Sequence, residues 1–267
     1  MKIAIIGRGR AGGGLAARLA DTRHPVRLYG GRDTTEVREK TILLTVPDPV
    51  IGAVAGRLTL RPSQVILHCS GSLGPEVLPA GARGVMHPLA SFADPARPPS
   101  LEGVTFLIAG DAPATQRARA IARALGARPL VAPLHGPAYH AAAALSANGA
   151  AALAAVAVRA LCALGLGPKD ARRAVGALLC TVGQNVERVG VPGALSGPIL
   201  RGDAATVRRH RDALEALDPA ARAAYDAIAP AILDQARRAG LPAEHAATIE
   251  AALARPPAPG SPERGSP

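Results

Sequence analysis

Short apolar runs alternate with amphipathic stretches through the first half of the chain. The runs have the length of strands and cover residues 3–6, 25–32, 41–46, 64–69, 84–86, 104–108 and 128–131. Helical patterns with one apolar face stand between them, over residues 15–19, 49–60 and 114–125. Strands and helices that alternate in this way predict an α/β domain with a parallel, doubly wound sheet.

From about residue 133 the pattern changes to helices alone. We predict four of them, over residues 135–164, 169–189, 204–217 and 219–239. The last residues are rich in Pro, Gly and Ser and too poor in apolar side chains to fold. The predicted organisation is an α/β domain over residues 1–132, an all-α domain over 133–254 and a disordered tail over 255–267.

The first apolar run leads directly into a glycine pattern, Gly7-Arg8-Gly9-Arg10-Ala11-Gly12. In such a pattern the first glycine allows a tight turn, the second lets a pyrophosphate approach the backbone, and the third lets a helix pack against the sheet. Free N–H groups at the start of that helix then bind the phosphates. The chain has 29 glycines, so the pattern can arise by chance, but the strand before it and the helix after it favour a dinucleotide site.

The end of the second run bears on which dinucleotide is bound. Sites for NAD usually place Asp or Glu there to bind the ribose hydroxyls, whereas a guanidinium suits the 2′-phosphate of NADP. Arg32 stands at this strand end. Asp33 follows it and would bind the ribose if the strand ran longer. The sequence therefore favours NADP, with NAD as the alternative.

Cysteine usage and hydropathy predict a cytoplasmic protein without a metal site. The three cysteines show neither metal-ligand nor disulfide spacing. The first residues lack the apolar core of a signal peptide. The uncharged stretch 136–158 is long enough to span a bilayer, but its many alanines favour a tightly packed, buried helix. We therefore expect no membrane partner.

The net charge of +11 comes almost wholly from arginine, because only three of the 31 basic residues are lysines. A charge of this size makes nucleic acid a partner to consider. Most arginines are spread along helical patterns, however, and the few aromatic residues offer no stacking surface for bases. Residues 207–211, Val-Arg-Arg-His-Arg, form the clearest basic cluster. We expect solvated helix faces and no nucleic-acid partner.

Polar residues follow three predicted strands at their carboxyl ends, where ligands bind in open α/β sheets. The groups are Val46-Pro47-Asp48, His68-Cys69-Ser70-Gly71 and His87-Pro88-Leu89. Structural interpretations also exist: Asp48 as a helix cap, His68 as a hydrogen-bonded core residue, residues 70–71 as a turn and 87–88 as a rigid loop. Our candidates for cofactor binding in these groups are Val46, Pro47 and Ser70. His87 is a candidate for substrate binding.

His140 and Asn148 lie on the first predicted helix of the second half. They are eight residues apart, which places them on one face of a regular helix, about 12 Å from each other. A lone histidine in an alanine-rich helix is often a packed, hydrogen-bonded residue, but the asparagine on the same face favours a site. We predict that this face meets the nicotinamide.

A polar, glycine-rich loop over residues 194–203 joins two of the predicted helices. Its composition is too polar for plain packing. Arg201 and Asp203 would close over a substrate, or Asp203 would only cap the helix that begins at residue 204. Ser196 is a further candidate for substrate binding in this loop.

Together these motifs resemble the DUF2520 family, bacterial proteins in which a Rossmann-like NADP-binding domain precedes a helical domain. The resemblance covers the chain to about residue 250. It rests on the glycine pattern, the three strand-end groups, Tyr139-His140 with Asn148, Asn185 and the loop 195–203. Ser196 stands where a threonine is expected and keeps the hydroxyl. The implied fold is a doubly wound Rossmann-like sheet followed by an all-α C-terminal domain.

The wider superfamily that the chain resembles includes pyrroline-5-carboxylate reductase, ketopantoate reductase, β-hydroxyacid dehydrogenases and 6-phosphogluconate dehydrogenase-like proteins. The resemblance implies hydride transfer to a C=O or C=N bond of a small polar substrate in the cleft between the domains. It also implies a homodimer formed through the helical domain.

One departure from these relatives concerns the proton donor. The hydroxyacid and ketopantoate enzymes place a lysine near an asparagine on the first interdomain helix, but this chain has His140 and no lysine between Lys40 and Lys169. A histidine, with an ordinary pKa of about 6.5, can donate a proton at neutral pH. We predict His140 as the acid and Asn148 as the residue that orients the substrate. The alternative function is an NADP-binding sensor or partner protein without catalysis.

Overall fold

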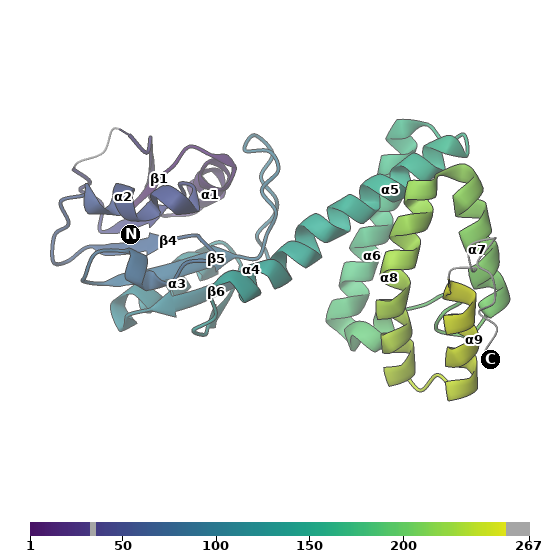
Figure 1. The fold of residues 1–267 in the computed structure, drawn as a ribbon. Coiled ribbons are helices and arrows are strands. Elements are labelled where there is room, and N and C mark those ends of the chain that lie inside the picture. Colours follow the sequence, from purple (N-terminus) through teal and green to yellow (C-terminus); the bar gives the residue numbers. More distant parts are fainter. Residues whose placement is uncertain (33–35, 255–267) are drawn as a thin grey trace, which may run out of the picture. The chain divides into compact units, whose positions relative to one another are not determined.

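The computed structural model describes residues 1–32 and 36–254 (Figure 1). The chain forms two compact units, of which the first is Met1–Gly149 and the second begins at Ala150. Asp33, the alternative ribose ligand, and the tail predicted over 255–267 lie outside the described residues.

The first unit is built on a seven-stranded sheet with the order β2-β1-β3-β4-β5-β6-β7. The strands are β1 (Ile3–Ile6), β2 (Val26–Tyr29), β3 (Thr41–Leu44), β4 (Val65–His68), β5 (Arg83–Pro88), β6 (Thr105–Gly110) and β7 (Arg128–Val131). Each predicted run thus forms a strand. The chain goes from β1 to β2 on one side and then returns to β3 on the other side of β1. Ligands of doubly wound sheets bind at the carboxyl ends of strands at such a switch point.

The prediction of an all-parallel sheet is wrong for the last two strands. β6 pairs antiparallel with β5, and β7 pairs parallel with β6 and so shares its direction. A parallel return needs a long crossover, usually a helix. The connection 89–104 contains no helix and packs instead on α1 (Arg10–Ala20), where Arg18 donates hydrogen bonds to the carbonyl oxygens of Pro98 and Pro99. The sheet is therefore mostly parallel.

Helices cover both faces of the sheet, which confirms the doubly wound arrangement. All of β1 is buried, and its side chains alternate between the faces. Ile3 and Ile5 pack with α1 and α3 (Ala112–Ala124). Ala4 and Ile6 pack with α2 (Ile51–Gly56), which follows the short helix η1 (Asp48–Val50).

The second unit is helical, as predicted. Its helices are α5 (Ala150–Ala163), α6 (Pro168–Ala194), α7 (Ala204–Leu217), α8 (Pro219–Arg238) and α9 (Ala243–Leu253). The sequence analysis missed α9. Its signal is weak but present, because Ala246, Ile249 and Ala252 recur at every third position and pack into the core formed with α7 and α8.

The long helix predicted over 135–164 is not regular. It consists of α4 (Pro137–Ala144), a π-helical turn η3 (Leu145–Gly149) and α5. None of its residues is buried within the described single chain, and the expectation that neighbours pack around this helix stays a prediction. By length and composition alone, Pro137–Ala163 is also long and apolar enough to cross a membrane, and a single helix of this kind is weak evidence for a membrane span.

A buried arginine connects three helices of the second unit, α7, α8 and α9. Arg211 of α7 is 6% exposed and donates hydrogen bonds to both carboxylate oxygens of Asp226 on α8, at 2.8 and 3.1 Å. It also donates to the carbonyl oxygens of Ala252 and Ala254 at the end of α9. Arg222 donates to the same carboxylate at 2.7 Å. Because Arg211 points into the unit, the cluster 207–211 is not a purely surface-exposed basic patch.

The carboxyl of Asp226 makes this unit sensitive to acid. Burial alone would raise its pKa, but the hydrogen bonds and charges of Arg211 and Arg222 outweigh burial and lower the pKa below the ordinary 3.8. A lowered folded-state pKa stabilises the fold above the ordinary pKa, and this stability is lost as the pH falls through the folded-state value. We expect Asp226→Asn to lower the free energy of unfolding by about 1–3 kcal/mol at pH 7 and to lower Tm by a few degrees. The range is modest because the carboxylate is partly exposed to solvent.

Thermal unfolding at pH 7 and at pH 3 and below measures this effect. The difference in Tm between the wild type and Asp226→Asn should become smaller as the wild-type carboxyl becomes protonated. Asp234→Asn is the matched control, because Asp234 lies on the same helix in an exposed pair with Arg238 and should change Tm little. Equal deficits for the two variants, or a deficit for Asp226→Asn that does not depend on pH, would contradict this role.

Candidate functional site

The glycine pattern after β1 has a steric basis at its two ends. Gly7 has a φ of +125°, and a Cβ on Gly12 would lie 1.9 Å from the carbonyl oxygen of Gly7. Thr45, which follows β3, donates a hydrogen bond from Oγ1 to that same oxygen at 3.0 Å. The two glycines therefore let α1 begin in contact with the ends of β1 and β3. Sequence reasoning missed Thr45, whose only signal is its place at a strand end.

Gly9 has no such steric reason within the described chain. A Cβ there would meet no atom within 4 Å, and Gly9 is the exposed N-cap of α1. Arg8 and Arg10 flank it and are exposed, and the first turn of α1 holds no acidic residue. Cations at the positive end of a helix dipole are unfavourable unless an anion joins them. Open backbone, free N–H groups and two guanidinium groups fit a pyrophosphate.

Two arginines lie at the loop that follows β2. Arg32 is exposed shortly after the strand. Arg57, the C-cap of α2, donates from Nη2 to the carbonyl oxygen of Gly31 at 2.9 Å. Val46 borders the same loop, because a Cβ on Gly31 would lie 3.2 Å from its Cγ1. Sequence reasoning missed Arg57, since only the fold brings the end of α2 to this strand.

Asp48 is not the helix cap that one interpretation predicted. The N-cap of η1 is Pro47, which is exposed, and no side chain among the described residues caps that helix. The Asp48 carboxylate instead accepts hydrogen bonds from the hydroxyls of Ser70 at 2.7 Å and Ser72 at 2.5 Å. Ser70 Oγ accepts from the backbone N–H groups of Ser72 and Leu73, which confirms the turn at residues 70–71. These bonds join the loops that follow β3 and β4.

His68 is a core residue, as its structural interpretation holds. It is fully buried, Nδ1 accepts from the N–H of Ser70 at 3.2 Å, and Nε2 then donates to the carbonyl oxygen of Gly74 at 3.1 Å. Burial lowers the pKa of His68. A neutral imidazole with both nitrogens bonded is a structural group rather than a ligand.

Three aromatic rings meet where β5 ends and α4 begins. His87 Nδ1 lies 2.7 Å from Tyr139 Oη, with the two rings edge to face, and the centroid of the His140 ring lies 6.2 Å from that of His87. Gly71 fits against both imidazoles, since a Cβ there would lie 2.9 Å from His140 Nδ1 and from His87 Cε1. The N–H of Gly136 donates to the carbonyl oxygen of Gly71 at 3.1 Å, which fixes the start of α4 to the loop after β4.

The protonation states of this group follow from burial. Burial, with a smaller contribution from the charge of His140, lowers the pKa of His87 to about 4. Burial also raises the pKa of Tyr139. At neutral pH the 2.7 Å bond therefore joins a neutral imidazole to a phenol. His87 positions Tyr139 and carries no imidazolium proton to donate.

A cavity of about 640 Å³ opens beside these rings. The loop after β5, α4 and η3 line it, with His87, Tyr139, His140, Ser146 and Asn148 among its residues. His140 and Asn148 thus share one cavity within the first unit. The π-helical turn, rather than a regular helix, sets their spacing, and such turns are frequent at functional sites.

The substrate candidates of the second unit lie on the loop before α7. Ser196 and Arg201 are exposed. Asp203 caps α7, because its Oδ1 accepts from the N–H of Thr206 at 2.9 Å. Bonding to Thr206 lowers the pKa of Asp203. The capping interpretation is confirmed, and the contact of these three residues with a substrate stays a prediction.

Residues 104–232 match the model of a protein family that is described as a domain of unknown function, DUF2520. The match runs from the start of β6 into α8. The expected resemblance to this family is confirmed over these residues, whereas the glycine pattern and the groups after β3, β4 and β5 lie outside the match. Comparison with curated proteins finds no match.

Solved structures share the fold of the chain. A protein from Thermotoga maritima is 24% identical, with 89% of this chain and 99% of that chain covered and a TM-score of 0.66. A candidate NADP oxidoreductase from Bacteroides fragilis is 19% identical, with 87% and 98% covered and a TM-score of 0.68. Pyrroline carboxylate reductase from Plasmodium falciparum, with NADP bound, is 13% identical, with 88% and 98% covered and a TM-score of 0.57. These likenesses show a Rossmann-like fold followed by a helical region.

Proposed function

We propose that this chain, which carries a DUF2520 region, is an NADP-dependent reductase that transfers a hydride from NADPH to a C=O or C=N bond of a small polar substrate. The observation that carries the proposal is that the glycine loop and the cavity of His140 lie at the same edge of the sheet. The open glycine loop follows β1, and the cavity with His140 and Asn148 adjoins the end of β5. Both lie at the carboxyl edge of the sheet, because β1, β3, β4 and β5 run parallel. Likeness to a candidate NADP oxidoreductase and to a reductase solved with NADP supports the assignment.

The residues at this edge suit each part of the dinucleotide. The backbone of Gly7, Gly9 and Gly12 and of Arg8, Arg10 and Ala11 would hold the pyrophosphate. Arg32 and Arg57 would bind the 2′-phosphate through charge-assisted hydrogen bonds. Val46, Pro47 and the loop at Ser70 would line the remaining edge. The nicotinamide, when bound, supplies the hydride, and the protein supplies position and electrostatics.

The cavity residues would complete the reaction. Charge develops on the substrate oxygen or nitrogen as the hydride arrives, and a proton must reach that atom. We assign the proton to the exposed imidazole of His140 and the orientation of the substrate to the amide of Asn148. His87 would hold the phenol of Tyr139 at the wall of the cavity. Ser196, Arg201 and Asp203 are proposed as additional substrate ligands from the helical unit.

Turnover tests the proposal most directly. We expect the wild type to oxidise NADPH with at least one member of a panel of 2-ketoacids and cyclic imines. His140→Ala should lower kcat/KM about 100-fold or more, the usual contribution of a general acid. Its NADPH affinity should change less than about twofold, which calorimetry measures. Ser146→Ala, in the same cavity but without an assigned role, is the matched control and should keep its activity.

The outcomes separate the two functions. NADPH binding without turnover on any member of the panel would favour the sensor function. Turnover that persists in His140→Ala would remove the histidine from the role of acid.

Variants of Arg32 and Arg57 test whether these two residues select NADPH over NADH. We expect Arg32→Ala and Arg57→Ala each to weaken NADPH binding about tenfold or more, because each removes charge-assisted hydrogen bonds to a phosphate. NADH lacks that phosphate, so its affinity should stay within about twofold. Calorimetric titration of both nucleotides measures the ratio, with Arg61→Ala, an exposed arginine on another loop, as control. Equal loss for NADPH and NADH would contradict the assignment.

We also propose a homodimer that forms through the helical unit. One face of α6 exposes large apolar side chains at helical spacing: Leu178 at 63%, Val182 at 42%, Val186 at 42% and Val189 at 50%. An exposed apolar stripe of this kind is typical of an interface.

Sedimentation tests this interface. We expect a dimer for the wild type and a monomer for the double variant Val182→Asp and Val186→Asp, because two carboxylates would be buried without partners. Gln184→Asp places one charge on the opposite side of the same helix and should remain dimeric. A monomeric wild type at micromolar concentration would overturn the proposal.

A further inference from the structure

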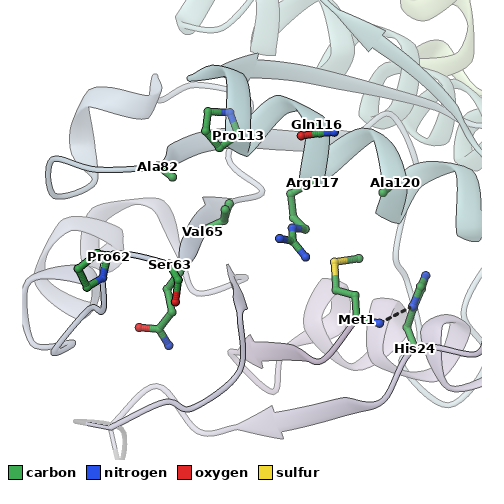
Figure 2. Close-up of a pocket in the computed structure, with 11 residues that line it drawn as sticks. Met1, His24, Pro62, Ser63, Val65, Ala82, Pro113, Gln116, Arg117 and Ala120 are labelled. Carbon is green, nitrogen blue, oxygen red and sulfur yellow. Dashed lines mark hydrogen bonds between the residues drawn. The ribbon is translucent and has the colours of Figure 1, made fainter.

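A second cavity, of about 530 Å³, lies at the other edge of the sheet (Figure 2). Its residues gather around the amino ends of parallel strands: Met1 precedes β1, Val65 begins β4 and Ala82 precedes β5. α3 forms another wall through Pro113 and Arg117. Because β1, β4 and β5 run parallel, this cavity is separate from the glycine loop and from the cavity of His140.

Arg117 points from α3 into this cavity (Figure 2). It is half-buried, and its guanidinium offers five N–H donors. Within residues 1–32 and 36–254 its side chain makes no hydrogen bond or ion pair with the protein, and no Asp or Glu is among the residues that line the cavity. A partly buried guanidinium without a protein acceptor is suited to an anionic ligand.

The other walls do not satisfy Arg117. The acceptor atom of Gln64, Oε1, already accepts from the backbone N–H of Arg61 at 2.7 Å, and its amide nitrogen donates to the carbonyl oxygens of Val37 and Glu39, at 2.7 and 2.9 Å. His24 Nδ1 lies 3.2 Å from the amino nitrogen of Met1. The remaining lining is largely apolar and includes Pro62, Val65, Ala82, Pro113 and Ala120. The cavity therefore combines an apolar surface with two cationic groups, the amino group of Met1 beside His24 and the guanidinium of Arg117, which has no protein acceptor among the described residues.

We propose that this cavity binds a small anion that carries an apolar group. Its carboxylate or phosphate pairs with Arg117, and its apolar part rests on Val65, Ala82 and Pro113. The volume is in the range of small-molecule sites, which combine a mainly apolar lining with a few polar groups. The site is independent of the proposed reductase activity, since it shares no residue with the glycine loop or the cavity of His140.

The two methionines of the chain make a direct test possible. Met1 lines the cavity, whereas Met86 is fully buried in the core and does not line it. Protein labelled with ¹³C at the methionine methyl groups is titrated with phenyl phosphate and with benzoate, which separates phosphate from carboxylate recognition. We expect a saturable shift of the Met1 methyl signal with at least one of these anions and none of the Met86 signal. Benzyl alcohol, which lacks the charge, and inorganic phosphate, which lacks the apolar group, should bind at least about tenfold more weakly.

Two arginine variants test the partner of the anion. Arg117→Ala should weaken the binding about tenfold or more, while an unchanged Met86 signal reports that the core is intact. Arg119→Ala removes an exposed arginine of the same helix that does not line the cavity, and its affinity should stay within about twofold. The proposal is overturned if neither anion gives a saturable shift at Met1, if Arg117→Ala binds as the wild type does, or if both variants lose binding equally.

Discussion

The close approach of α1 to the ends of β1 and β3 is the constraint on which the first unit depends. No side chain fits at Gly12, because a Cβ would lie 1.9 Å from the carbonyl oxygen of Gly7. Thr45 adds a hydrogen bond to that oxygen from the end of β3. The start of the helix is thereby held at the switch point of the sheet, where its free N–H groups are exposed beside Arg8 and Arg10.

Side-chain hydrogen bonds hold the other loops of this edge to one another. Asp48 joins the loop after β3 to the serines after β4. Gly71 lets the same loop pack against His87 and His140. Its carbonyl oxygen accepts a hydrogen bond from the N–H of Gly136, the N-cap of α4. Groups that must act together on one ligand need such support from their neighbours. The chain's own hydrogen bonds therefore hold the loops of this edge to one another.

The sequence predicted what depends on local pattern. Fully buried strands such as β1 appear as continuous apolar runs, and the glycine pattern has its meaning within a few residues. The features that the sequence did not predict depend on contacts between residues that are far apart along the chain. The antiparallel β6 follows a connection, 89–104, that packs on α1 instead of forming a crossover helix. The roles of Asp48 and Arg57 follow from partners more than 20 residues away. The alanine-rich composition of α4 and α5 favours burial, but composition does not specify which neighbours would bury these helices.

The central claim is that a nicotinamide dinucleotide binds along the carboxyl edge of the first unit. Hydrogen–deuterium exchange of the wild-type protein, with and without saturating NADPH, tests it by locating the ligand. Our account predicts that NADPH slows exchange in the amides of residues 8–13 and in the loops at 46–48 and 70–73. An absence of protection there, or protection confined to the amino edge around Val65 and Arg117, would contradict it.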